Sequence, residues 1–151
     1  MSRILGIDYG EKRVGLALTD KSNQMAGPLA VLNNDGFLKD KIIEIIKKHD
    51  IGKIIIGMPL NLKGHYGYQA DIVTKFISDI IEPLGLPVET FDERFTSSIS
   101  VELSGIAHKT ARSQSKGQAR KKKEKRLSGD IDKISAAILL NDYLAKNIFQ
   151  K

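Results

Sequence analysis

The apolar residues of the chain form short continuous runs in some segments and a helical repeat in others. Continuous runs rich in β-branched residues favour strands, and they occupy residues 4–7, 14–18, 25–32, 53–58 and 88–91. Residues 9–12, a short segment with a glycine, separate the first two runs and predict a hairpin. Pro28 makes the third run an edge or irregular strand, because proline has no N–H to donate to a neighbouring strand.

Apolar residues that recur every three or four positions predict the helices. The first expected helix covers residues 36–49. The second has its apolar stripe at residues 72–81 and ends near residue 83. The third covers residue 96 or 97 to about 106, and the last covers residue 128 to about 148.

Three strands followed by alternating strands and helices predict a single α/β domain over residues 1–151, with a mixed sheet and helices on its faces. Strand–helix–strand connections are right-handed, which places the strand at 53–58 beside the first strand. Binding sites in such open sheets form beyond the carboxyl ends of the strands. We therefore expect the chemistry of this protein at that edge of the sheet.

Acidic residues stand at the ends of two predicted strands and at the start of the last helix. Asp8 ends the first strand, and Asp92 and Glu93 end the last one. Asp132 lies in the first turn of the final helix and begins a face that is otherwise apolar, formed by Ala136, Leu139, Leu140 and Tyr143. Clustered carboxylates repel one another unless a cation lies between them. The pattern therefore favours a metal site.

The chain has no cysteine and only three histidines, so a hard cation such as Mg²⁺ or Mn²⁺ suits these oxygen ligands best. Two such ions about 3.5–4 Å apart can activate a water and stabilise the leaving oxygen of a phosphodiester. Each acid also has an ordinary structural role open to it. Asp8 can cap a turn, Asp132 can cap a helix, and Glu93 can pair with Arg94. Spacing alone leaves both interpretations open.

The positive charge of the chain is concentrated in one segment. The net charge is +6 and the sequence pI is about 9.5. Residues 109–126 hold nine Lys or Arg and one Glu, a net charge of +8, so the rest of the chain carries −2. Such a block is either a solvated loop or an arm that binds the phosphates of a nucleic acid. We expect an arm.

Features that the sequence lacks indicate where the protein is located. Without cysteine, disulfides and thiolate metal sites are excluded. No apolar stretch is long enough to span a bilayer, and the N-terminus lacks the pattern of a signal peptide. We expect a cytoplasmic protein with no membrane partner.

Four segments of the chain resemble, in order, the motifs of one protein family. They are ILGIDYGEKRVGLALTD, IIIGMPLN, DERFTS and DKISAAILLNDYL. The chain resembles the YqgF family, also called RuvX or the pre-16S rRNA nuclease family and once described as Holliday junction resolvases, over nearly its whole length. The resemblance implies a ribonuclease H-like fold and phosphodiester hydrolysis with a divalent metal. It also implies a cytoplasmic bacterial protein that acts on precursor rRNA or on branched DNA.

By position, the resemblance implies that Asp8, Glu93 and Asp132 are the catalytic, metal-binding acids. Asp92 stays an alternative ligand, because neighbouring residues of a strand point to opposite faces and only one of the pair can reach the site. The candidates for contact with nucleic acid are Lys12, Arg13, Asn61, Arg94, Arg120, Lys121, Lys122 and Lys123.

The chain departs from the family at a few positions. Lys63 precedes Gly64 where an acid is common, Asp130 adds an acid near Asp132, and the basic segment is unusually rich in lysine. None of these changes removes a catalytic residue. The lysines leave open whether RNA or DNA is preferred.

Three other functions can be weighed from the residues. A junction resolvase would use the same chemistry on branched DNA and would need a dimer with two active sites, whereas the sequence leaves a monomer or a weak dimer open. A binding module that no longer cuts is disfavoured, since binding needs phosphate contacts rather than clustered acids. An actin-like ATPase shares the first strand turn but needs two such domains around its nucleotide.

Overall fold

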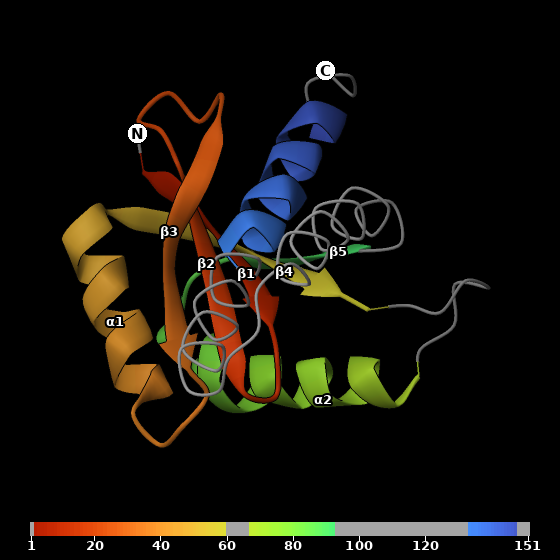
Figure 1. Ribbon diagram of the computed structural model, residues 1–151. Coiled ribbons are helices and arrows are strands. Elements are labelled where there is room, and N and C mark those ends of the chain that lie inside the picture. Colours follow the sequence, from red (N-terminus) through yellow and green to blue (C-terminus); the bar gives the residue numbers. More distant parts are fainter. Residues whose placement is uncertain (1, 60–66, 93–132, 148–151) are drawn as a thin grey trace, which may run out of the picture.

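A five-stranded mixed sheet forms the frame of the structure, a computed structural model that describes residues 2–59, 67–92 and 133–147 (Figure 1). The strand order is β3-β2-β1-β4-β5. β1 pairs antiparallel with β2 and parallel with β4, and β5 extends the parallel half. The predicted mixed sheet, with the fourth strand beside the first, is confirmed. The bounds are β1 Arg3–Tyr9, β2 Arg13–Thr19, β3 Ala26–Asn33, β4 Ile51–Met58 and β5 Val88–Asp92.

The proline in β3 lies at an irregularity on the edge of the sheet. Leu16 of β2 pairs with Ala30, but the next residue, Ala17, pairs with Pro28, so Leu29 is the extra residue of a bulge. β3 is the outermost strand on this side, where a missing N–H interrupts no further pairing. The irregular edge strand predicted from Pro28 is confirmed.

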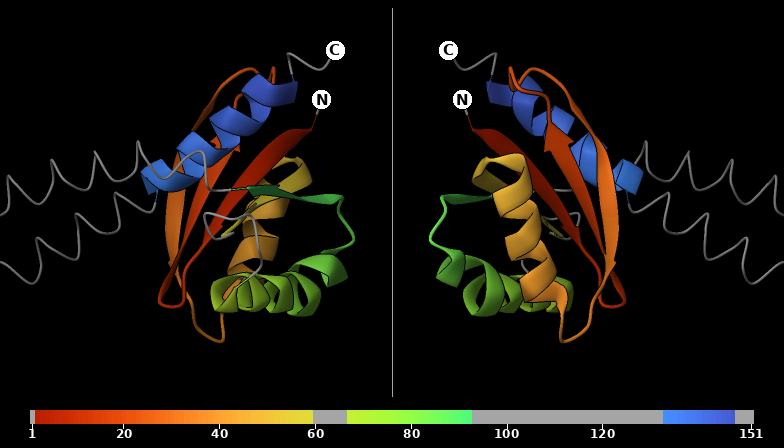
Figure 2. Two further views of the ribbon diagram at one scale, coloured as in Figure 1. Left: turned by 90° about the vertical axis from the view of Figure 1, so that its right-hand side faces the viewer. Right: turned by 90° about the vertical axis from the view of Figure 1, so that its left-hand side faces the viewer.

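Helices cover both faces of the sheet. Helices α1 (Leu38–His49) and α2 (Tyr68–Phe76) lie on one face, and a C-terminal helix, residues 133–147 in the described part, lies on the other (Figure 2). α1 ends at Asp50, which adopts the left-handed conformation with a φ of 53°. The helix predicted over residues 96–106 falls outside the described residues.

The second predicted helix changes its winding before it ends. α2 continues into a π-helical turn at Ile77–Ile81 and a 3₁₀ turn at Glu82–Leu84. Pro83 has no N–H with which to extend an α-helix, and Gly85 follows in the left-handed conformation, with a φ of 77°. The helix stops where the sequence predicts, but the apolar period did not indicate the two changes of winding.

Two apolar layers hold the helices to the sheet. One layer packs α1 and α2 on the strands and includes Leu5, Ile7, Leu16, Ile42, Ile54, Ile56, Val73 and Phe76. The other packs the C-terminal helix on the opposite face and includes Ala17, Ile55, Phe91, Ala136, Leu139, Leu140 and Tyr143. Burial of each large aliphatic side chain contributes about 1.5–3 kcal/mol relative to exposure. Because side chains alternate along each strand, each apolar layer packs against one face of the sheet.

Gly6 lets the C-terminal helix lie close to β1. A Cβ atom at this position would lie 3.0 Å from Cβ of Leu140 and 3.4 Å from the backbone oxygen of Ala136. Carbon atoms pack at about 3.5–4.0 Å, so a side chain at this position would require the helix to shift slightly. The contact also shows that position 6 of β1 faces the C-terminal helix.

We expect Gly6→Ala to lower the free energy of unfolding by about 1–3 kcal/mol, because the added methyl forces the helix away from the strand. Gly27→Ala in β3 is the matched control, since a Cβ there would meet nothing within 4 Å. The control should stay within about 0.5 kcal/mol of the wild type. Urea unfolding measures both values. Equal stability of Gly6→Ala and the wild type would contradict the close approach.

Candidate active site at the carboxyl edge of the sheet

Asp8 lies near the carboxyl end of β1, the middle strand of the sheet, and its side chain is half-buried. Because Gly6 faces the C-terminal helix, alternation places Asp8 on the same face. Its partner on β2 is Gly15, and the register of β4, extended by one residue, brings Gly57 to its other side. The residues directly opposite Asp8 on both adjacent strands are therefore glycines, which have no side chain. The sequence analysis did not single out these two glycines, although each stands inside a strand run.

The side chains of β5 alternate between the two faces, which separates Asp92 from Asp8. Val88 packs in the layer under α1 and α2. Glu89 binds Tyr143 of the C-terminal helix, and Phe91 packs in the layer beneath that helix. By this alternation, the half-buried Asp92 falls on the α1 and α2 face, opposite to Asp8.

The C-terminal helix presents the apolar face that the sequence predicts. Its residues Ala136, Leu139, Leu140 and Tyr143 are all buried. Figure 1 shows the helix across the sheet, with its N-terminal end toward the carboxyl end of β1. This direction agrees with the contacts, since Ala136 lies at Gly6 whereas Asn141 binds the first residue of β3. Asp132 falls outside the described residues.

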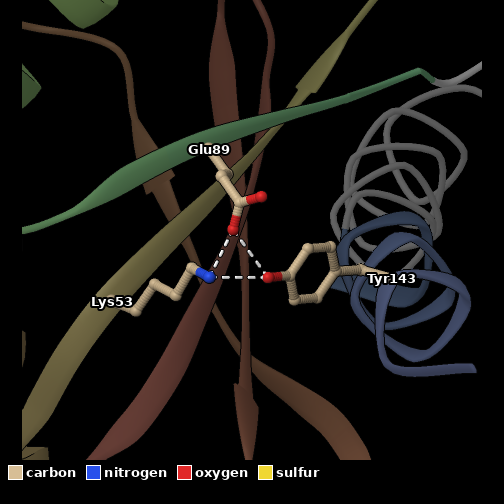
Figure 3. Close-up of polar contacts among 3 residues, drawn as sticks. All are labelled: Lys53, Glu89 and Tyr143. Atoms are coloured by element: carbon tan, nitrogen blue, oxygen red, sulfur yellow. Dashed lines mark hydrogen bonds and ion pairs between the residues drawn. The ribbon is translucent and has the colours of Figure 1, made fainter. Parts of the chain in front are cut away.

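Polar contacts fix the far half of the C-terminal helix. The Asn141 side chain accepts from the N–H of Ala26 (2.8 Å) and donates to its carbonyl (2.9 Å). Lys53 of β4, Glu89 of β5 and Tyr143 form a triangle of contacts (Figure 3). In it, the Tyr143 hydroxyl accepts from Lys53 Nζ (2.7 Å) and donates to Glu89 Oε2 (2.7 Å), and Lys53 also forms an ion pair with Glu89. Together these contacts tie the helix to three strands, β3, β4 and β5.

The triangle should contribute stability between moderately acidic and strongly alkaline pH. The bond from Lys53 lowers the pKa of Glu89, and Glu89 in turn raises the pKa of Lys53. A carboxyl with a lowered pKa stabilises the fold above its unfolded pKa and loses this contribution as pH falls. A lysine with a raised pKa stabilises the fold below its unfolded pKa and loses this contribution as pH rises through the folded pKa.

We expect Glu89→Gln to lower the free energy of unfolding at pH 7 by less than about 1 kcal/mol, because the side chains of Lys53 and Glu89 are 35% and 52% exposed. The difference from the wild type should shrink once the pH falls below about 4. Urea unfolding of both proteins across this range measures it. A difference that is the same at pH 7 and at pH 3 would show that the charge of Glu89 has no part in the effect.

The turn after Asp8 is held tightly. A Cβ atom on Gly10 would lie 2.5 Å from the carbonyl oxygen of Arg13, so only glycine fits. The Asn34 side chain donates to the carbonyl of Gly10 (2.9 Å) and to the hydroxyl of Tyr9 (2.8 Å). The turn glycine noted in the sequence thus has a steric reason.

A pocket of about 150 Å³ opens beside this turn, on the α2 side of the same edge. Its walls include Tyr9, Gly10 and Glu11 of the turn and Gln69, Ile72 and Val73 of α2. The pocket could not be predicted from local sequence patterns, because the turn and the helix are about sixty residues apart in the chain. No local sequence pattern indicates that the turn and α2 lie next to each other.

The predicted nucleic-acid contacts are only partly within the described residues. Lys12 is exposed and Arg13 half-buried, both close to Asp8 in the chain. The other predicted nucleic-acid contacts lie outside the described residues: Asn61, Arg94, Arg120, Lys121, Lys122 and Lys123. Two of the predicted metal ligands, Glu93 and Asp132, also lie outside them. Within residues 2–59, 67–92 and 133–147, no three acidic, histidine or cysteine residues lie close enough to hold a metal ion. Of the three predicted catalytic acids, the described residues include only Asp8.

A family model described as "RuvX: Holliday junction resolvase" matches residues 2–146. The chain belongs to the RuvX family. A protein of Sulfurihydrogenibium sp. (strain YO3AOP1), named "Putative pre-16S rRNA nuclease", is 40% identical over 151 residues, which cover 99% of this chain and 94% of that protein. A protein of the same name from Endomicrobium trichonymphae is 39% identical over 146 residues, covering 95% and 96%. The family resemblance seen in the four motifs is confirmed.

Solved structures of low sequence identity share the fold of this RuvX protein. RuvC of T. thermophilus in complex with a Holliday junction substrate superposes with a TM-score of 0.55 at 12% identity, covering 99% of this chain and 97% of RuvC. The Fowlpox virus resolvase in complex with Holliday junction DNA gives 0.52 at 14% identity, covering 97% and 99%. The ribonuclease H-like fold is thereby confirmed. No helix in the described part of this protein is long and apolar enough to cross a membrane.

Proposed function

We propose that this RuvX protein is a metal-dependent nuclease that hydrolyses phosphodiester bonds at the 5′ end of precursor 16S rRNA during ribosome biogenesis. The observation that carries the proposal is the position of Asp8. It is a half-buried carboxylate at the carboxyl end of the central strand, on the face covered by the helix that Asp132 would begin. The family match and the relatives' name support the same reaction.

Asp8, Glu93 and Asp132 are the acids that we assign to catalysis and to binding Mg²⁺ or Mn²⁺. Asp8 fits a hard cation, because it offers carboxylate oxygens and the adjacent strand positions are glycines. Such ions, when bound, supply an activated water and stabilise the leaving oxygen of the phosphodiester. The chain's own part is to hold the acids on a rigid sheet and helix, so that little reorganisation is needed when substrate arrives.

The alternation along β5 supports Glu93 rather than Asp92 as the second acid. Asp92 falls on the face opposite to Asp8, with Val88. If the pleat of β5 continues by one residue, Glu93 follows Glu89 and Phe91 onto the face of the C-terminal helix. Glu93 then shares that face with Asp8, as the family resemblance implies.

Cationic residues near this edge are assigned to the phosphates of the substrate. Lys12 and Arg13 follow Asp8 on the turn and at the start of β2. Asn61, Arg94 and the lysine-rich segment with Arg120, Lys121, Lys122 and Lys123 add further contacts. Lysine contacts with phosphate carry no sequence information, so these residues increase affinity without choosing the site of cleavage. We propose a single catalytic domain that acts in the cytoplasm, where precursor rRNA is made.

A second candidate is a Holliday junction resolvase that acts on branched DNA. The description of the family model favours it, as do the two structural neighbours solved with such junctions. We prefer the rRNA substrate, because the neighbours are only 12% and 14% identical whereas relatives at 39–40% identity carry the rRNA name.

A cleavage assay separates the two functions. Precursor 16S rRNA, four-way DNA junctions and single-stranded RNA are incubated with the protein in Mg²⁺ and in Mn²⁺. The proposal expects cleavage of the rRNA precursor near its 5′ end in the presence of either ion and none in EDTA. Symmetrical cleavage of the junction, with the precursor left intact, would replace the first function by the second. Failure to cut any of the three substrates would contradict both.

A further inference from the structure

An exposed aromatic residue directly precedes a residue that lines the pocket beside the Asp8 turn. Tyr68 is the first residue of α2 and is 76% exposed. The next residue, Gln69, lines the pocket, and so does Ile72, one helical turn further on the same side. Burial in the fold does not explain an aromatic ring in this position. Aromatic rings held in solvent next to a pocket are suited to stacking on a ligand.

The size and chemistry of the pocket fit one aromatic ring that carries amino groups. A cavity of about 150 Å³ can hold a benzene molecule, and this pocket has the same volume. Ile72 and Val73 provide an apolar wall, while Glu11 and Gln69 provide polar groups. The carboxylate of Glu11 repels a phosphate but accepts hydrogen bonds from the amino group of a nucleobase.

The turn wall of the pocket is formed before any ligand arrives. The ring of Tyr9 packs on Phe76 with ring centroids 4.4 Å apart. Its hydroxyl accepts a hydrogen bond of 2.8 Å from the Asn34 side chain, which also binds Gly10. A pocket with fixed walls loses little entropy on binding.

Residues that line the pocket directly follow the candidate active site in the chain. Tyr9 and Gly10 directly follow Asp8, and Pro59, another wall residue, directly follows β4. Asp8 faces the C-terminal helix, whereas Tyr9 packs in the layer of α1 and α2. A nucleic-acid strand that has a phosphate at Asp8 and runs across the edge of the sheet toward α2 would bring a neighbouring base to the pocket.

We infer that Tyr68 and this pocket bind one unpaired nucleobase next to the phosphate that is cut. A base held in a duplex cannot enter, because its edge is paired and both of its faces are stacked. The site therefore selects substrates with single-stranded or unpaired nucleotides at the cleavage position. The inference rests on the proposed nuclease function and adds its substrate class.

Binding in EDTA tests the inference separately from catalysis. The probes are a single-stranded RNA oligonucleotide with one 2-aminopurine and the same strand in a full duplex. Tyr68→Leu keeps an apolar side chain but has no aromatic face, and Tyr68→Phe keeps the face. Met25→Ala is the control for an exposed apolar side chain, since Met25 is 70% exposed and precedes β3 at the opposite end of the sheet.

Stacking on a base contributes enough that its loss weakens binding by about 5- to 150-fold. Tyr68→Leu should show this loss for the single strand and less than about a twofold change for the duplex. Tyr68→Phe and Met25→Ala should bind both probes as the wild type does. The wild type and Tyr68→Phe should alter 2-aminopurine fluorescence, which Tyr68→Leu should not.

Two results would overturn the inference. One is equal affinity of Tyr68→Leu and the wild type for the single strand, and the other is an equal loss for single strand and duplex. Neither outcome bears on the nuclease function, which the cleavage assay with Mg²⁺ tests by itself. A wild type that prefers the single strand through Tyr68 but cuts no substrate would contradict the nuclease function and leave the base site in place.

Discussion

Asp8→Asn should abolish cleavage in a protein that still folds. Asparagine keeps the shape of the side chain but removes the charge that binds the cation. Loss of a group that only supports a metal ligand lowers metal affinity or activity by about 10–100-fold. Loss of a ligand itself should therefore lower the single-turnover rate by at least about 1,000-fold. Stability in EDTA should be unchanged or slightly higher, because one of several like charges is removed.

The measurement for Asp8 combines single-turnover cleavage of precursor rRNA at saturating concentration with urea unfolding. Asp79→Asn is the matched control, since Asp79 is an exposed acid in the turn that follows α2. The control should cut at the rate of the wild type. A folded Asp8→Asn protein that also cuts at that rate would remove Asp8 from the mechanism.

The neighbouring acids of the last strand should differ sharply when each is neutralised. Glu93→Gln should lower the single-turnover cleavage rate by at least about 1,000-fold, as for Asp8, because loss of a ligand should cost more than the 10–100-fold lost with a group that only supports one. Asp92→Asn should stay within about threefold of the wild type, because Asp92 lies on the face opposite to Asp8. The same single-turnover assay compares them, and each variant is the control for the other.

The direction of this difference also tests the strand register. A large loss in Asp92→Asn with little change in Glu93→Gln would mean that the pleat of β5 shifts at its end, and Asp92 would take the place of Glu93 as ligand. Equal and large losses would indicate that both acids serve the site.

Local patterns in the sequence predict the elements well, because each strand and helix is set by the apolar residues that it buries. Residues 54–58 of the predicted run are buried on both faces and lie between β1 and β5, as a central parallel strand must. The apolar face of the last helix is the face that packs on the sheet. Pro28 identified the edge strand because its chemistry forbids a central position.

Contacts between individual side chains of distant segments could not be predicted, although the order of the strands could. Alternation showed that only one of Asp92 and Glu93 can point to the site, but the identity of each face follows only from contacts such as Phe91 with the C-terminal helix. The bond network of Lys53, Glu89 and Tyr143 joins three elements that share no sequence motif. A role for Tyr68 in binding can be inferred only because α2 and the turn after Asp8 line the same pocket.

The shared metal site is tested most sharply by a crystal structure with Mn²⁺, in which the anomalous scattering of manganese locates the ion. We expect a peak within about 2.0–2.4 Å of carboxylate oxygens of Asp8 and Asp132, with Glu93 rather than Asp92 on the same side of the sheet. The peak should be absent from crystals of Asp8→Asn. Carboxylates of Asp8 and Asp132 that lie more than about 10 Å apart, with manganese at neither, would contradict a shared site, because direct ligands must all lie close to one ion.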